Sequence, residues 1–140
     1  MKKFILHSAL LSVILSFPLV CRAEISVIVN LANSDALSES AIKGVFLGKI
    51  KTFPSGSQAI PVAQPKDAAA SVEFTEKVYK KSAKQLKSYW SKLLFTGQGV
   101  PPKEVASDQD VLKLVAENPN IIGYVSSSVV DASVKEVAKF

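Results

Sequence analysis

The residues whose types and spacing could do chemistry lie in the stretch AIPVAQPKDAAASVEFTEKVY, residues 59–79. Its apolar start predicts a strand, and three alanines and a serine then lead into the pattern of a helix. Unpaired backbone N–H groups point outward at a helix N-terminus, where they can hold an anion. We therefore expect a weak candidate anion site made of Lys66, Ala69, Ala70 and Ser71.

The same turn also has a purely structural interpretation. Asp67 and Ser71 are common helix-capping residue types, and alanines are good helix formers. A helix dipole contributes on the order of 1 kcal/mol to a nearby anion, and a charge-assisted hydrogen bond adds about 1.5–3 kcal/mol. Micromolar capture needs roughly 8 kcal/mol. A water-exposed site of this composition would therefore be weak, and the Asp67 carboxylate would compete for its N–H groups.

Three residue types that carry much of protein chemistry are confined to the N-terminal stretch. His7, Cys21 and Arg22 are the only histidine, cysteine and arginine of the 140-residue chain. The residues that follow Arg22 contain no histidine, cysteine or arginine. They cannot form a disulfide, a Cys/His zinc site, a histidine-activated nucleophile or a guanidinium fork. Asp108 and Asp110 are two residues apart at a predicted helix start, so they do not face each other as paired catalytic carboxylates would. We expect no enzyme, no metal site and no cofactor.

The first 23 residues have the pattern of a signal peptide. A basic start precedes an almost wholly apolar run, and Cys21 and Ala23 are the small residues that favour cleavage after Ala23. We expect residues 1–23 to be removed and residues 24–140 to be secreted, with membrane contact only through an uncleaved leader. A membrane anchor fits less well because the apolar run is short and contains a proline. Lipoprotein attachment at Cys21 would need small residues just before the cysteine.

The exported part is nearly neutral but carries a local excess of lysine. Lysine and arginine total 17, three of which lie in the leader, so 14 basic residues remain against 12 acidic ones. A basic cluster on two predicted helices could meet an acidic partner, phospholipid or peptidoglycan; the alternative is a solvated helix face. No nucleic-acid partner is expected, because there is neither arginine nor a stacking platform. The cluster consists of Lys77, Lys80, Lys81, Lys84, Lys87 and Lys92.

Strands alternate with helices along residues 24–140, which predicts one α/β domain with a mixed sheet flanked by helices. Strands are expected at 24–30, 59–63 and 120–125, and residues 134–140 form either a short strand or a frayed tail. Helices are expected to begin at caps and to turn apolar side chains inward. The caps are Ser38, Asp67, Ser82 and Ser107, and the inward residues include Val72, Phe74, Val78, Leu86, Trp90, Leu93 and Leu94.

Three stretches together resemble a known family. They are AIKGVFLGKI at 41–50, the strand, turn and helix at 59–79, and NPNIIGYV at 118–125. In this order and spacing they are similar to the periplasmic phosphate-binding proteins of ABC transporters, and more narrowly to a short, single-lobe branch. The resemblance implies the second lobe of a type 2 periplasmic-binding fold, in which two α/β lobes close on an anion. It further implies a periplasmic location, phosphate or another small anion as ligand, and an ABC permease as partner.

At the turn, the sequence departs from the family pattern. The family has an arginine, then serine or aspartate, then a Ser-Gly-Thr run at the helix start. Pro65 stands at the arginine position, Ala68, Ala69 and Ala70 at the small and hydroxyl positions, and Ser71 at the threonine position. The resemblance therefore implies a solute-binding-like protein with a degenerate anion site. The alternative is a periplasmic protein-interaction module that has lost its ligand and binds another envelope protein.

Overall fold

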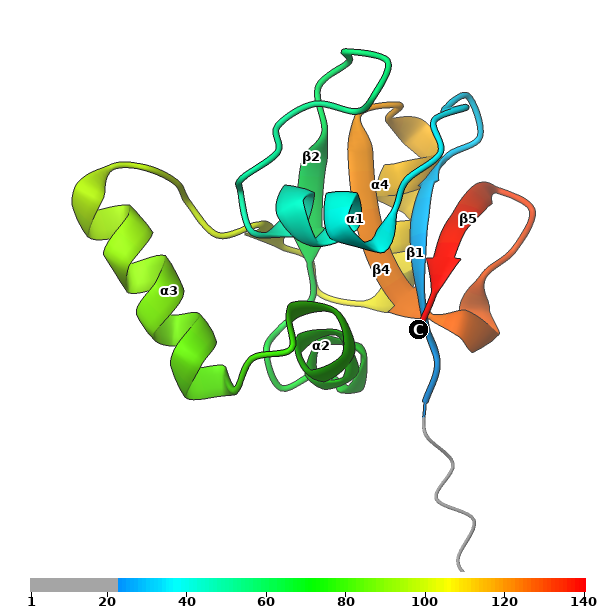
Figure 1. The fold of residues 1–140 in the computed structure, drawn as a ribbon. Helices are drawn as coiled ribbons and strands as arrows, with labels where there is room; N and C mark the ends of the chain where they lie inside the picture. The colour runs from blue at the N-terminus through cyan, green and yellow to red at the C-terminus, as the bar shows by residue number, and fades with distance from the viewer. Residues whose placement is uncertain (1–22) are drawn as a thin grey trace, which may run out of the picture.

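The computed structural model describes residues 23–140 (Figure 1). The predicted signal peptide lies outside the described residues, except for Ala23. Within the described part, no helix combines the length and the apolar character that crossing a membrane requires.

A five-stranded mixed sheet forms the centre of the fold (Figure 1). Its strands, in spatial order, are β3 (Lys103–Glu104), β2 (Ile60–Ala63), β4 (Ile121–Ser126), β1 (Ile25–Asn30) and β5 (Val134–Lys139). β1 pairs antiparallel with β4 and β5, whereas β2 pairs parallel with β4 and β3. The predicted mixed sheet is confirmed, and the C-terminal segment forms a strand rather than a frayed tail.

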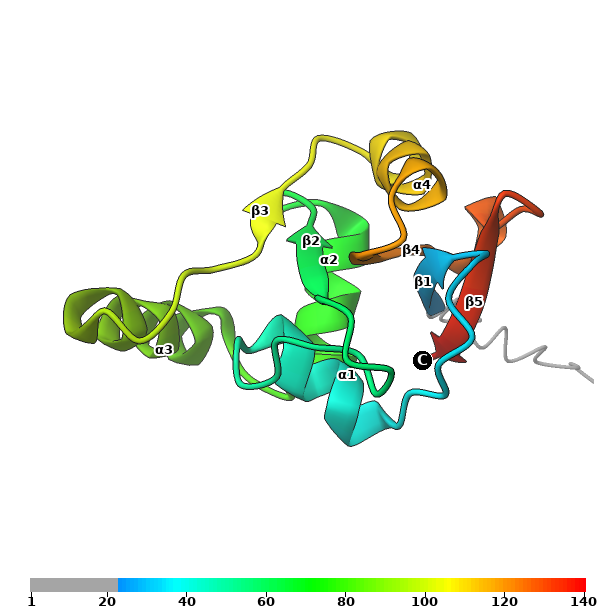
Figure 2. The ribbon, with the colours of Figure 1, turned by 90° about the horizontal axis from the view of Figure 1, so that it is seen from above.

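The sheet separates two hydrophobic cores. Val27 belongs to the core under α1 (Glu39–Phe46) and α2 (Ala69–Phe74), whereas Ile28 belongs to the core under α4 (Asp108–Glu117). Figure 2 shows α1 and α4 on opposite sides of the sheet. All six residues of β1 are buried, because strands flank both of its edges and helices cover both faces.

Three of the predicted helix starts are confirmed. The side chains of Ser38 and Ser107 accept hydrogen bonds from the backbone N–H three residues on, at the starts of α1 and α4. Ser82 and Gln85 form the predicted capping box before α3 (Ala83–Thr96), in which each side chain bonds the other residue's backbone N–H. These caps act locally along the chain, which is why the sequence pattern identified them.

The predicted cap at Asp67 is wrong. The Ala68 N–H donates to the Pro65 carbonyl at 2.9 Å, and this turn places Asp67 one residue before the N-cap position. Ala68 is the N-cap of α2, and no side chain caps the helix within the described residues. α2 then runs directly into a π-helical turn, η1 (Thr75–Tyr79), which ends at Lys80 with φ 52°.

Two residues predicted to face inward are exposed instead. Val72 and Leu94 have exposed fractions of 51% and 53%. α3 projects from the body of the molecule (Figures 1 and 2), and Trp90 is its one buried residue. Trp90 thus packs inward as predicted, and the neighbouring Tyr89 hydroxyl donates to the Leu47 carbonyl at 2.7 Å. The apolar stripe of α3 is therefore only partly covered by the rest of the fold.

We expect Gly123→Ala to destabilise the fold by about 1–3 kcal/mol, the usual cost of overpacking a core. A Cβ at Gly123 would lie 2.6 Å from Cγ1 of Val111 and 3.1 Å from Cγ2 of Val62, both in buried side chains. Urea unfolding of the purified variant measures this change.

The matched control is Gly44→Ala on α1. Its new Cβ would meet the half-exposed side chain of Ile50, with the Cδ1 atom 2.7 Å away. That side chain can move, and replacing a helical glycine with alanine gains up to about 1 kcal/mol. Equal losses of stability in the two variants would contradict the assignment of Gly123 to a tight packing contact.

Candidate functional site

The candidate anion site lies in the turn between β2 and α2. Lys66 and Ala69 are exposed, whereas Ala70 and Ser71 are buried. The structure therefore keeps the four predicted residues in one turn, but only two of them present their side chains to solvent.

The backbone at this turn retains the geometry of an open helix start. The N–H of Val72 donates to the Ala68 carbonyl at 3.1 Å, which is the first helical hydrogen bond of α2. The N–H groups of Ala69, Ala70 and Ser71 precede that bond, and such groups have no partner inside their own helix. Because no side chain caps α2 within residues 23–140, these N–H groups are the main feature that the turn offers an anion.

The Ser71 hydroxyl points into the protein rather than toward solvent. It donates to the Gln64 carbonyl at 2.9 Å and lies 2.7 Å from the Tyr124 hydroxyl. The residue is only 4% exposed. Since the single hydroxyl proton of Ser71 goes to Gln64, the Tyr124 hydroxyl is the donor in their contact. Ser71 therefore contributes its backbone N–H to the candidate site, while its side chain joins the turn to the core.

Gln64 links this turn to the start of α4. Its side-chain amide donates to the Asp108 carboxylate at 2.5 Å and to the Tyr124 carbonyl at 3.1 Å. The Asp108 carboxylate also accepts from the Ser126 N–H at 3.4 Å. The sequence placed Asp108 at a predicted helix start but did not indicate this polar cluster. The signal that could have found it is the polar Gln64 directly after an apolar strand, where a buried amide needs partners.

Tyr124 occupies the centre of the polar cluster. Its hydroxyl accepts from the Gln64 N–H at 3.1 Å, and its ring stacks on Phe74 with centroids 4.0 Å apart. Burial raises the pKa of the Tyr124 phenol, although hydrogen bonds with Ser71 and Gln64 act in the opposite direction. The phenol therefore stays protonated at physiological pH and serves as a structural donor.

Two further kinds of site in the described residues would be a metal site and an unpaired buried polar group. Within residues 23–140, no group of three histidine, cysteine, aspartate or glutamate side chains is arranged to hold a metal ion. Every buried side-chain nitrogen or oxygen in the same part of the chain has a hydrogen-bond partner. The polar cluster is therefore internally satisfied.

We expect Ser71→Ala to lower stability by about 1–3 kcal/mol, because the buried Gln64 carbonyl and Tyr124 hydroxyl each lose a partner. The free energy of any weak phosphate binding should change by less than the free energy of unfolding does. Paired urea unfolding and phosphate titration of wild type and variant measure both effects. Ser91→Ala, at an exposed position of α3, should stay within about 0.5 kcal/mol of wild type. Loss of affinity at unchanged stability would contradict the inward role of the hydroxyl.

Alkaline pH should destabilise the protein partly through Tyr79. Burial, and then the nearby Tyr124 and Tyr89, raise the pKa of the Tyr79 phenol. The pKa of tyrosine in an unfolded chain is about 10. Above that pH, the unfolded chain releases a proton that the folded protein retains. Stability is therefore complete below about pH 10 and falls as the pH rises further.

Tyr79→Phe tests this dependence. In the wild type, the Tyr79 hydroxyl donates a long hydrogen bond of 3.4 Å to the Phe46 carbonyl. Its loss should therefore change the free energy of unfolding at pH 7 by about 1 kcal/mol or less. Urea unfolding between pH 7 and 11 should show a shallower alkaline decline than in wild type. Parallel declines in the two proteins would contradict the role of the buried phenol.

Comparisons with known proteins give a match in fold. No protein-family model and no curated protein matches the chain. An ABC-type phosphate transport receptor from Vibrio cholerae matches with a TM-score of 0.63 at 19% identity, over 82% of this chain and 46% of that one. A phosphate ABC transporter substrate-binding protein with bound phosphate, from Clostridium perfringens, matches with a TM-score of 0.64 at 24% identity, over 82% and 45%. PstS from Borrelia burgdorferi matches with a TM-score of 0.62 at 11% identity, over 83% and 47%.

The chain spans less than half the length of these solved structures. At such low identities the matches establish the fold, and they agree with the mixed sheet and its flanking helices. Residues 23–140 therefore have the α/β fold of a single lobe of a periplasmic binding protein, and the proteins that share it include phosphate-binding components of ABC transporters.

Proposed function

We propose that this protein is a periplasmic solute-binding-like protein related to the substrate-binding component of phosphate ABC transporters. The observation that carries the proposal is the fold match over more than four-fifths of the chain with such proteins, one of them with bound phosphate. Fold alone does not dictate function, so the proposal must also be consistent with the chemistry of the site.

The anion site in this proposal is degenerate. The open N–H groups of Ala69, Ala70 and Ser71 favour an anion, and Lys66 can add one ammonium. The Ser71 hydroxyl is already used inside the protein. A helix dipole of about 1 kcal/mol and one charged hydrogen bond of about 1.5–3 kcal/mol together reach at most about 4 kcal/mol. That sum corresponds to a dissociation constant of about 1 mM.

The proposed setting is the periplasm, after removal of the signal peptide at residues 1–23. An ABC permease is the expected partner, and phosphate or another small anion is the expected weak ligand. Binding rather than catalysis fits the described residues, which include no histidine or cysteine that could serve as a base or nucleophile.

A second candidate function is a periplasmic protein-interaction module. The observation that favours it is the set of exposed apolar side chains on and after the projecting helix α3. Leu94, Phe95 and Val100 have exposed fractions of 53%, 94% and 72%. Such side chains are common at protein interfaces when they lie together on one surface. An envelope protein would be the partner in this case.

We expect inorganic phosphate to bind with a dissociation constant weaker than about 1 mM. Isothermal titration calorimetry on the purified protein measures this value, with sodium chloride of equal ionic strength as the control titrant. A low-micromolar constant would contradict the degenerate site. Absence of any phosphate-specific heat at tens of millimolar would favour the interaction module.

The variant Pro65→Arg tests whether phosphate binds at this turn. It places a guanidinium at the position where the phosphate-binding family has arginine. A charge-assisted hydrogen bond of about 1.5–3 kcal/mol should tighten phosphate binding about tenfold or more. Ala132→Arg, at an exposed turn before β5, adds the same side chain and the same charge elsewhere and should leave the affinity unchanged. Equal effects of the two substitutions would indicate general charge attraction instead of a site at the turn.

A further inference from the structure

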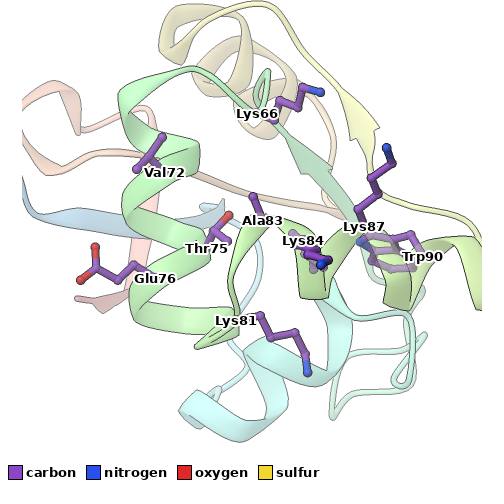
Figure 3. Close-up of a pocket in the computed structure, with 10 residues that line it drawn as sticks. Lys66, Val72, Thr75, Glu76, Lys81, Ala83, Lys84, Lys87 and Trp90 are labelled. Atoms are coloured by element: carbon purple, nitrogen blue, oxygen red, sulfur yellow. The ribbon is translucent and has the colours of Figure 1, made fainter.

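A groove separates α2 and η1 from the first two turns of α3. It has a volume of about 720 Å³. In Figure 3, Val72 and Thr75 lie on the helix formed by α2 and η1, Lys84 and Trp90 lie across from them on α3, and Lys66 lies in the turn before α2. Volumes of about 300–1,000 Å³ are typical of sites that hold small molecules. The groove is therefore large enough for a ligand of moderate size.

The floor of this groove is apolar. Val72, Leu86 and Trp90 line it from two different helices. The Trp90 ring packs edge-on against Tyr89, with centroids 5.0 Å apart. This contact holds the indole in place beside the groove. Val72, on a helical position predicted to be buried, is exposed beside this floor.

The rim of the groove is cationic. Lys66, Lys81, Lys84 and Lys87 line it, and Glu76 is the acidic residue among the lining side chains. The Lys81 ammonium lies 5.8 Å from the centre of the Tyr89 ring. Lys77 pairs with Glu73, and Lys139 pairs with Glu24. Neither pair includes Lys66, Lys84 or Lys87, which line the groove.

This combination points to a ligand with both an apolar body and a negative charge. Inorganic phosphate would leave the apolar floor in contact with water, and a neutral hydrocarbon would leave the lysines unmatched. A second copy of this chain would bring like charges together at the rim, which is unfavourable. A single hydrocarbon chain can enter a groove between two helices, whereas a flat bilayer surface cannot.

We propose that this groove binds a free amphiphilic anion with one hydrocarbon chain and a carboxylate or phosphate head. The chain lies on Val72, Leu86 and Trp90, and the head is held by Lys84 and Lys87. The wall from Ala83 to Trp90 is about two helical turns, or roughly 10 Å, long. This length matches a hydrocarbon chain of moderate length. Lys66 belongs to both the proposed phosphate site and the groove, but the inference otherwise uses the groove and not the N–H groups of the turn.

Tryptophan fluorescence provides the test, because Trp90 is the only tryptophan of the sequence. We expect monomeric decanoate to shift its emission in a saturable way. Decanol, which has the same chain without the charge, and inorganic phosphate, which has charge without the chain, should need at least tenfold higher concentrations. Equal responses to decanoate and decanol would overturn the proposal. A response only to vesicles of anionic phospholipid, and not to monomeric decanoate, would also overturn it in favour of membrane docking.

Matched variants locate the site. Lys84→Gln with Lys87→Gln should weaken decanoate binding about tenfold, and Val72→Ser should weaken it as well. Lys92→Gln removes a lysine from the same helix outside the groove and should leave binding unchanged. Circular dichroism confirms that each variant is folded. An unchanged affinity in the Lys84 and Lys87 double variant would overturn the proposal, and phosphate calorimetry on the same variants tests the proposed anion site separately.

Discussion

The contacts of Tyr124 connect the core of this fold to its candidate site. The ring stacks on Phe74 of α2 in the core, while the hydroxyl bonds Ser71 and the backbone of Gln64. One side chain on β4 therefore fixes both the end of β2 and the start of α2. A buried phenol of this kind must keep its hydrogen-bond partners, since an unpaired buried polar group costs about 1–3 kcal/mol. The position of the turn is thus set by core packing rather than by a ligand.

This constraint has a direct consequence for anion binding. A hydroxyl that donates inward cannot also donate to a ligand, because serine has a single hydroxyl proton. The turn keeps the backbone N–H groups of a helix start, but its side chains contribute little beyond Lys66. The shared fold and the proposed weak site are therefore compatible: the single-lobe fold is present, while most of the side-chain donors expected from the family pattern are not.

Besides Lys66 of that turn, several lysines lie on and just before α3. This helix projects from the body, and its Trp90 packs inward while lysines surround an apolar groove against α2. Lysine stems cover apolar surface while their ammonium groups remain in water, which suits such a rim. The two surfaces differ in chemistry: the turn offers N–H groups to a small anion, and the groove offers apolar contact together with charge.

The sequence by itself determined the features that depend on neighbouring residues. Helix starts at Ser38, Ser82 and Ser107, the β-branched strand β1 and the α/β class all followed from local pattern. Only the tertiary structure decided what depends on distant segments. The pairing of Gln64 with Asp108 joins residues 44 positions apart, and the exposure of Val72 depends on where α3 lies. Periodicity identifies an apolar face, but it cannot tell whether another helix packs on that face or leaves a groove beside it, because that depends on how the whole chain packs.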